Sequence, residues 1–148
     1  MKKETVLEIE EIFDVPFFSH GSYEETFDGF KIKTSKAEYK ILIENMQWCC
    51  EDWGYFSTND NPKEFVGKNL LSVNISGNEA ARKIEFEKAK KRNDSGLEYV
   101  DFRDAQFVDF VMDDGSVLQF AVYNCHNGYY GHDVLFLKNK KKLLYSSL

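Results

Sequence analysis

Residues 107–123, with the sequence FVDFVMDDGSVLQFAVY, contain the strongest fold signal in the chain. Two runs rich in Val and Phe flank Asp114-Gly115, a pair that suits a tight hairpin turn because both central residues need positive φ. A second pair of this kind, Asn127-Gly128, precedes another apolar run at 132–137. The pattern therefore predicts two consecutive hairpins, which would form a three-stranded antiparallel meander over residues 105–138.

Weaker strand signals lie upstream of this region. Residues 6–13 mix apolar and acidic side chains and fit either a strand or a short helix. Alternation of apolar and polar side chains is typical of a half-buried strand. On this basis and on β-propensity we predict strands at residues 27–34, 39–44, 53–57 and 70–75.

One segment has helical character. Residues 79–92 are rich in Ala, Glu, Lys and Arg, and Ser76-Gly77-Asn78-Glu79 fits a capping box. We therefore predict one helix at about residues 79–92. The expected fold is a single α+β domain spanning residues 1–148, mainly an antiparallel β meander with that helix.

Charge is distributed unevenly along the chain. Residues 1–30 contain eight carboxylates and two lysines, so this segment accounts for the whole net charge of −6. Two basic runs follow, at residues 82–92 and 138–142. The ordinary interpretation is solvated surface. The sharper hypothesis is an acidic face that contacts a basic protein or ribonucleoprotein, while the overall sign makes direct nucleic-acid binding less favourable.

The acidic residues proposed as partner contacts are expected to contribute more to association than to folding, because clustered like charges at a surface add little stability. They are Glu8, Glu10, Glu11, Glu24, Glu25 and Asp28.

Composition also argues against several protein classes. No apolar run reaches the length of about 18 residues that a membrane-spanning helix needs. The first residues lack the apolar stretch of a secretory signal, so we expect a cytoplasmic protein of a bacterial host cell.

Three cysteines are too few for a disulfide framework. No phosphate-binding or dinucleotide motif is present, and no cofactor is predicted. The oligomeric state is left open.

The pair Cys49-Cys50 is the first candidate for chemistry. Neighbouring residues of an extended chain point to opposite sides, and zinc ligands are usually separated by two to four residues, so no metal site is predicted. A nucleophilic cysteine working with His132 is a weaker alternative, since neither cysteine lies in a known nucleophile motif. Buried structural thiols are the default interpretation, and no catalytic residue is assigned.

Residues 124–132 form the densest group of polar and aromatic side chains. In the predicted meander Tyr123 lies opposite His132. Tyr and His on a rigid turn make good contact surface, so the predicted partner contacts here are His126, Tyr129, Tyr130 and His132. The alternative function is a small-molecule binder or small Cys/His hydrolase that combines Cys49-Cys50 with this hairpin.

The chain resembles the DUF7448 family at two motifs. One is Tyr39-Lys40-Ile41-Leu42-Ile43 followed by Cys49-Cys50-Glu51, and the other is Asn127-Gly128-Tyr129-Tyr130. The similarity covers about residues 38–138 and leaves the acidic segment outside. The resemblance implies a small domain of unknown function from phages and prophage-carrying bacteria, and it transfers no catalytic residue. The leading hypothesis is a non-enzymatic protein-binding module, for instance an anti-CRISPR-like inhibitor of a bacterial defence system.

Overall fold

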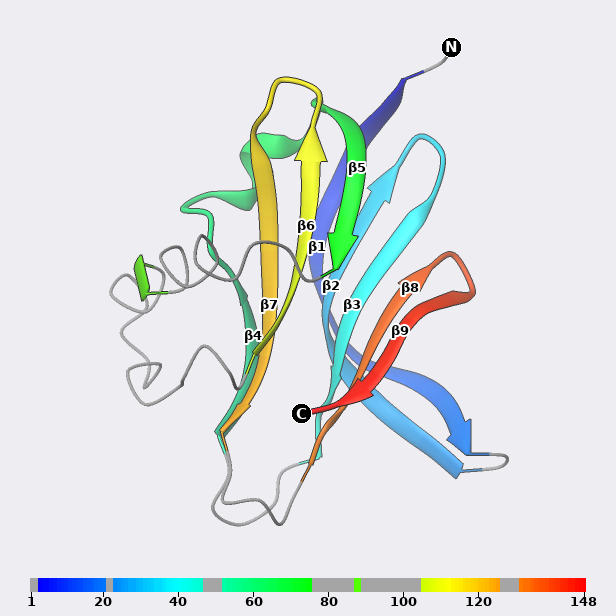
Figure 1. Ribbon diagram of the computed structural model, residues 1–148. Helices are drawn as coiled ribbons and strands as arrows, with labels where there is room; N and C mark the ends of the chain where they lie inside the picture. The colour runs from blue at the N-terminus through cyan, green and yellow to red at the C-terminus, as the bar shows by residue number, and fades with distance from the viewer. Residues whose placement is uncertain (1–2, 21–22, 47–51, 76–86, 89–104, 126–130) are drawn as a thin grey trace.

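The computed structural model describes residues 3–20, 23–46, 52–75, 87–88, 105–125 and 131–148 (Figure 1). Nine strands and one short 3-10 helix make up most of its regular structure. These elements are β1 (Glu4–His20), β2 (Tyr23–Thr34), β3 (Glu38–Glu44), β4 (Asp52–Ser57), η1 (Pro62–Phe65), β5 (Asn69–Ile75), β6 (Ala105–Met112), β7 (Val117–Cys125), β8 (Asp133–Lys138) and β9 (Lys141–Ser147).

All nine strands belong to one antiparallel sheet in the order β4-β7-β6-β5-β1-β2-β3-β8-β9. The sheet folds over at β1. Glu4 and Thr5 pair with β5, whereas the rest of β1 pairs with β2 along its length. The strands from β4 to β5 therefore face those from β2 to β9 as two layers (Figure 1). The acidic segment of the sequence thus supplies the central strand and its neighbour.

Aromatic side chains fill the space between the two layers. The ring of Tyr39 on β3 lies 5.3 Å from that of Phe110 on β6, and Phe30 on β2 lies 4.5 Å from Phe120 on β7. Phe136 on β8 makes a further edge contact with Phe110. Each fully buried Phe of this kind contributes about 2–3 kcal/mol through the removal of apolar surface from water. The core therefore packs β6 and β7 of one layer against β2, β3 and β8 of the other.

A smaller apolar cluster lies on the outer face of β2, β3 and β8, where Phe27, Leu42 and Leu135 are buried. The β1–β2 hairpin reaches this cluster through Phe17, whose ring lies 6.3 Å from that of Phe27. A bulge between Ile12 and Val15 redirects β1 there.

Two residues allow the hairpin to bend. Asp14 lies in the bulge with φ of 53°, a left-handed conformation that Asp tolerates better than most residues. Gly29, opposite Ile12, lies so close to β3 that a Cβ atom there would overlap the carbonyl oxygen of Ile41. The close approach of β2 and β3 therefore requires glycine at position 29.

The predicted strands at 27–34, 39–44, 53–57 and 70–75 are confirmed as parts of β2, β3, β4 and β5. The α+β class is wrong, because the described residues form an almost entirely antiparallel β structure. Of the predicted helix at 79–92, only Glu87 and Lys88 are described; both are helical and exposed, and the remainder lies outside the described residues. The α+β class had rested on that helix. Residues 6–13, for which a strand and a short helix were both considered, belong to β1.

The first predicted hairpin is confirmed, because Val111 pairs with Val117. Its turn differs from the predicted type: Gly115 has φ of 86°, but Asp114 does not have positive φ. The three-stranded meander is wrong. β7 pairs with β4 and β6, whereas β8 pairs with β3 and β9, so Tyr123 lies opposite Gly54 and Ala105 rather than His132. The Asn127-Gly128 motif lies outside the described residues. A turn motif is a local signal, whereas strand partners are chosen by the packing of the whole sheet.

Candidate protein-binding surfaces

Two of the predicted contact residues, Glu8 and Glu10, lie opposite lysines. In the β1–β2 register Glu8 pairs with Lys33 and Glu10 with Lys31. The Lys31 ammonium lies 2.6 Å from a Glu10 carboxylate oxygen. Its hydrogen bond lowers the pKa of Glu10, and the same contact raises the pKa of Lys31. The charge of Glu10 is therefore compensated by Lys31, whereas Glu8 lies opposite Lys33 in the register without forming an ion pair among the described residues.

Glu11, Asp14 and Asp28, together called the acidic cluster below, have neutral partners instead. Tyr55 on β4 donates its hydroxyl to Glu11 at 3.1 Å. The Asn45 side-chain amide donates to Asp14 at 2.7 Å and to Asp28 at 2.9 Å. Burial, the Glu11 hydrogen bond and the nearby charges of Glu11 and Asp28 raise the pKa of Tyr55, so its hydroxyl stays protonated. These contacts fix the carboxylates without cancelling their charge.

Apolar side chains adjoin the acidic cluster in the chain. Phe13, next to Asp14, is 60% exposed, and Met46, next to Asn45, is also exposed. Phe13 lies in the register shift between Ile12 and Val15, and a bulge of this kind can redirect a side chain toward solvent. An exposed aromatic side chain beside fixed carboxylates is an arrangement that suits a protein interface. Sequence analysis did not predict this bulge.

The remaining acidic residues of the predicted set lie elsewhere. Glu25 is buried, and its carboxylate lies within 4.8 Å of those of Glu44 and Asp133. Tyr145 donates a hydrogen bond to Asp133 at 3.0 Å. Carboxylate oxygens are ligands for hard cations, but a group of acids alone does not define a metal site. Glu24 pairs through its backbone with β1, and its side chain lies outside the described residues.

His132 is a buried structural residue, with no exposed surface. Its Nδ1 atom lies 2.6 Å from the Glu44 carbonyl oxygen, an acceptor, so this nitrogen carries the proton. Its ring stacks on Trp53 of β4 at 5.3 Å, and its backbone exchanges two hydrogen bonds with Leu148. In this conformation the side chain offers no surface to a partner.

Other predicted residues cannot be placed. His126, Tyr129, Tyr130, Cys49 and Cys50 lie outside the described residues. The backbone of Cys125 pairs with Asp52, but its side chain is likewise outside them.

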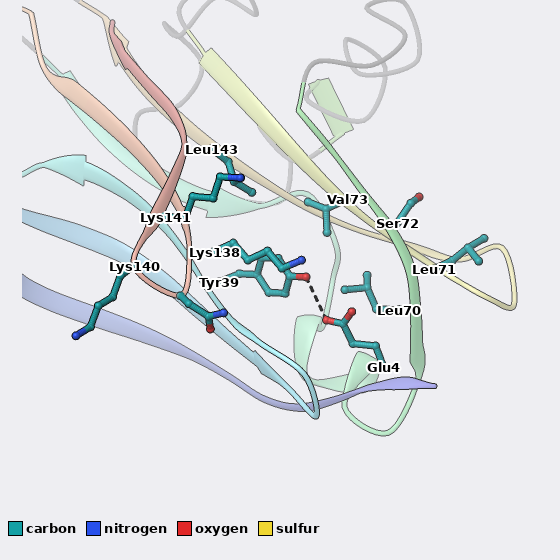
Figure 2. Close-up of a pocket in the computed structure, with 11 residues that line it drawn as sticks. Glu4, Tyr39, Leu70, Leu71, Ser72, Val73, Lys138, Lys140, Lys141 and Leu143 are labelled. Carbon is teal, nitrogen blue, oxygen red and sulfur yellow. Dashed lines mark hydrogen bonds between the residues drawn. The ribbon is translucent and has the colours of Figure 1, made fainter. Parts of the chain in front are cut away.

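A groove of about 880 Å³ opens between β5 and the β8–β9 hairpin (Figure 2). Figure 2 shows β5 side chains on one side of the groove, β8–β9 side chains on the other, and Tyr39 and Glu4 between them. The apolar wall is formed by Leu70, Leu71, Val73 and Leu143, and the cationic rim by Lys138, Lys140 and Lys141. The sequence showed the lysine run but not the strand that faces it.

The floor of the groove is fixed by hydrogen bonds. One carboxylate oxygen of Glu4 accepts from Thr34 at 2.7 Å and from Tyr39 at 3.1 Å. Burial is the main cause that raises the pKa of Tyr39, and the Glu4 charge adds to it. The Lys138 ammonium lies 5.9 Å from the Tyr39 ring centroid. Within the described part of the chain, the rim lysines form no ion pair.

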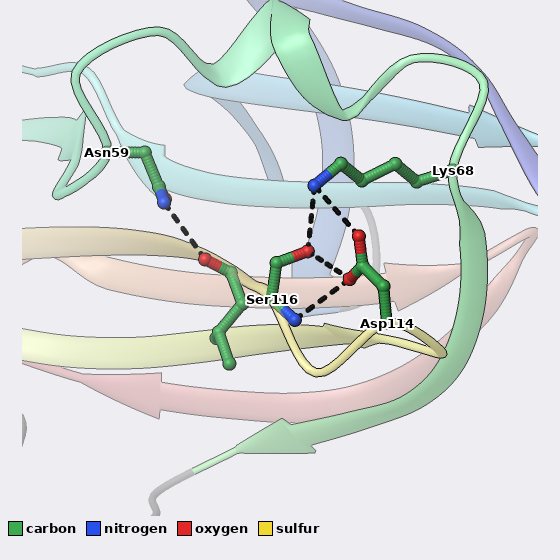
Figure 3. Close-up of polar contacts among 5 residues, drawn as sticks. Asn59, Lys68, Asp114 and Ser116 are labelled. Carbon is green, nitrogen blue, oxygen red and sulfur yellow. Dashed lines mark hydrogen bonds and ion pairs between the residues drawn. The ribbon is translucent and has the colours of Figure 1, made fainter.

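Lys68, just before β5, differs from these rim lysines because it is held by the β6–β7 turn (Figure 3). Its ammonium lies 3.1 Å from Asp114 and 3.0 Å from the Ser116 hydroxyl. The Ser116 hydroxyl and backbone N–H both donate to Asp114, and with Lys68 they lower the pKa of this carboxyl to about 2. The turn is thus fixed by side-chain contacts as well as by Gly115.

Within the described part of the chain, helices lack the length and hydrophobicity of a transmembrane segment.

Comparisons with curated proteins and with solved structures gave no match to this chain. The sequence model of the domain of unknown function DUF7448 matches residues 4–136. This range takes in all of β1 and β2, which the two short motifs had left outside the resemblance. Because the match covers most of the sequence, the chain belongs to the DUF7448 family.

Proposed function

We propose that this chain is a non-enzymatic protein-binding module that contacts a basic partner through the acidic cluster and Phe13. The observation that carries the proposal is the arrangement at the β1 bulge. There, the exposed Phe13 lies between Glu11 and Asp14 in the chain, and among the described residues both carboxylates accept hydrogen bonds from neutral groups only. The contact surface is therefore smaller than the acidic segment as a whole.

The carboxylates and the aromatic side chain would contribute to different parts of binding. Fixed carboxylates steer a positively charged partner toward the surface and raise the association rate, with strong dependence on ionic strength. An aromatic side chain that becomes buried on binding supplies affinity and slows dissociation. Glu8 and Glu10 contribute less to steering, because Lys33 and Lys31 lie opposite them.

The concrete form of the proposal is a phage or mobile-element protein that inhibits a bacterial defence system, as anti-CRISPR proteins do. Acidic surfaces can occupy basic channels that otherwise hold nucleic acid. The support for this setting is the family resemblance together with the acidic cluster. We do not extend the proposal to a Cys/His hydrolase, because the His132 ring is buried and its Nδ1 proton is directed at the Glu44 carbonyl.

Affinity capture from a bacterial lysate, followed by direct binding of the identified and purified partner, tests the proposal. The variants E11K and F13A should each weaken binding of that partner by about tenfold or more, with E11K losing most at low salt. The matched control K140E/K141E changes charge at the groove and should leave this binding intact. Unchanged binding of E11K and F13A, with their melting temperatures preserved, would refute the proposed surface.

A further inference from the structure

We propose that the groove between β5 and β9 binds an extended acidic peptide, which adds as a strand to the free edge of β5. This inference is independent of the acidic cluster, which lies elsewhere on β1 and β2. It rests on three properties of the groove: an open strand edge, an apolar wall and a cationic rim.

The open edge results from how the sheet folds over. β5 pairs with β6 from Leu70 to Ile75, with a register shift at Leu71, but it pairs with β1 only at Leu70 and Asn69. From Leu71 to Ile75, the side of β5 that faces away from β6 has no strand partner within the described residues. That edge offers backbone donors and acceptors over about five residues, or about 17 Å, which is enough for strand addition by a short peptide.

The apolar wall gives a peptide side chain somewhere to pack. Leu71 is 69% exposed, and Leu143 on β9 faces the same groove from the other side. β9 is itself the last strand of the sheet order. An extended segment lying against β5 would therefore be covered by β9 side chains and would bury apolar surface that the free chain leaves in water.

The cationic rim selects an acidic occupant. Lys138, Lys140 and Lys141 line the groove and have no carboxylate partner among the described residues. Asn139 fixes the turn that carries them, because it donates its backbone N–H to Glu38 at 2.7 Å and accepts from the Glu38 N–H at 3.0 Å. All three are therefore held at one side of the groove, and Figure 2 shows that Lys138 and Lys141 extend toward it, whereas the Lys140 side chain points away from β5.

A peptide fits this surface better than a nucleic acid does. Single-stranded nucleic acids are usually held by exposed aromatic rings on which bases stack. The aromatic residue that lines the groove, Tyr39, is buried and donates its hydroxyl to Glu4. An open backbone edge and aliphatic walls instead match a polypeptide.

Fluorescence polarisation with defined probes tests the inference. The probe is a labelled heptapeptide that alternates Glu and Val, the charge control replaces Glu with Lys, and a labelled oligothymidine represents nucleic acid. We expect the acidic peptide to bind, the basic peptide not to bind, and the acidic probe to bind about tenfold more weakly to K140E/K141E. The matched control K36E/K63E reverses two exposed lysines outside the groove lining and should bind normally.

Amide hydrogen exchange tests the strand addition itself. Bound peptide should slow exchange in residues 71–75, and the variant L71E should weaken binding through both repulsion and lost packing. Binding that persists in L71E without protection of these amides would overturn strand addition. Binding of the oligothymidine but not the acidic peptide would identify a nucleic-acid surface instead. Self-association that K140E/K141E abolishes would identify a second copy of the chain as the occupant.

The absence of any peptide binding at millimolar concentration would overturn the inference as a whole. None of these outcomes bears on E11K or F13A, so the two proposals fail separately.

Discussion

The β1–β2 hairpin and the β8–β9 turn carry opposite charges, and they differ in how those charges are compensated. Glu8 and Glu10 lie across from Lys33 and Lys31 in adjacent strands. In contrast, Lys138, Lys140 and Lys141 line a groove and form no ion pair among the described residues. The segment that accounts for the net charge of −6 is thus partly neutralised, while a short basic run keeps its charge available.

The net charge of a segment therefore does not show where its binding surface lies. A strand pairs with whichever strand lies beside it, and a carboxylate opposite a lysine is already compensated. Charge remains available where the backbone bends away from its neighbour, as at the Asp14 bulge, or where a turn projects beyond the sheet, as at Asn139. The available charge is therefore set by sheet topology.

The largest expected effect concerns the bend that holds the acidic hairpin against β3. The variant G29A should lower the free energy of unfolding by about 3 kcal/mol or more, because the new Cβ would overlap backbone atoms of Ile41 that cannot rotate away. Urea unfolding measures the loss. G115A is the control: Gly115 has open space around it but φ of 86°, so its substitution should cost about 1 kcal/mol. Equal losses in the two variants would show that the β2–β3 contact is not tight.

A smaller effect on the melting temperature should distinguish a charge that is held in an ion pair from a charge that is not. In E10K, the new lysine would lie opposite Lys31 and replace an ion pair with a repulsion. We expect its melting temperature to fall by about 1–3 °C, and more at low salt than at high salt. In K140E the melting temperature should not fall, because Lys140 has no ion-pair partner among the described residues. A larger loss in K140E than in E10K would reverse the comparison.

The sequence was informative where the signal was local. Side-chain alternation found β2 and β3, and Asp114-Gly115 found the β6–β7 turn, because both depend on neighbouring residues. Strand partners were not predictable in this way. The lysines at 138–142 were visible as a run, but the facing edge of β5 lies far away in the sequence. The exposure of Phe13 depends on a one-residue bulge that composition does not reveal.

The smallest expected effect concerns Lys68, the lysine whose charge the β6–β7 turn compensates. The Ser116 hydroxyl and N–H, together with Lys68, lower the pKa of Asp114 from 3.8 to about 2 in the folded chain. A lowered folded-state pKa means that the ionised carboxylate stabilises the fold. This contribution is fully present above a pH of about 4 and is lost as the pH falls through about 2. The melting temperatures of wild type and D114N should therefore differ at pH 5 and converge near pH 2.

Other carboxylates titrate over the same range, so the comparison uses the difference between wild type and D114N at each pH rather than either curve alone. S116A provides the matched variant. It removes the hydroxyl that is the largest cause of the lowered pKa, so the Asp114 contribution should be lost at a higher pH than in wild type. A difference between wild type and D114N that stays constant from pH 5 to pH 2 would mean that ionisation of Asp114 does not stabilise the turn. Lys68 would then be no better compensated than the lysines of the groove rim.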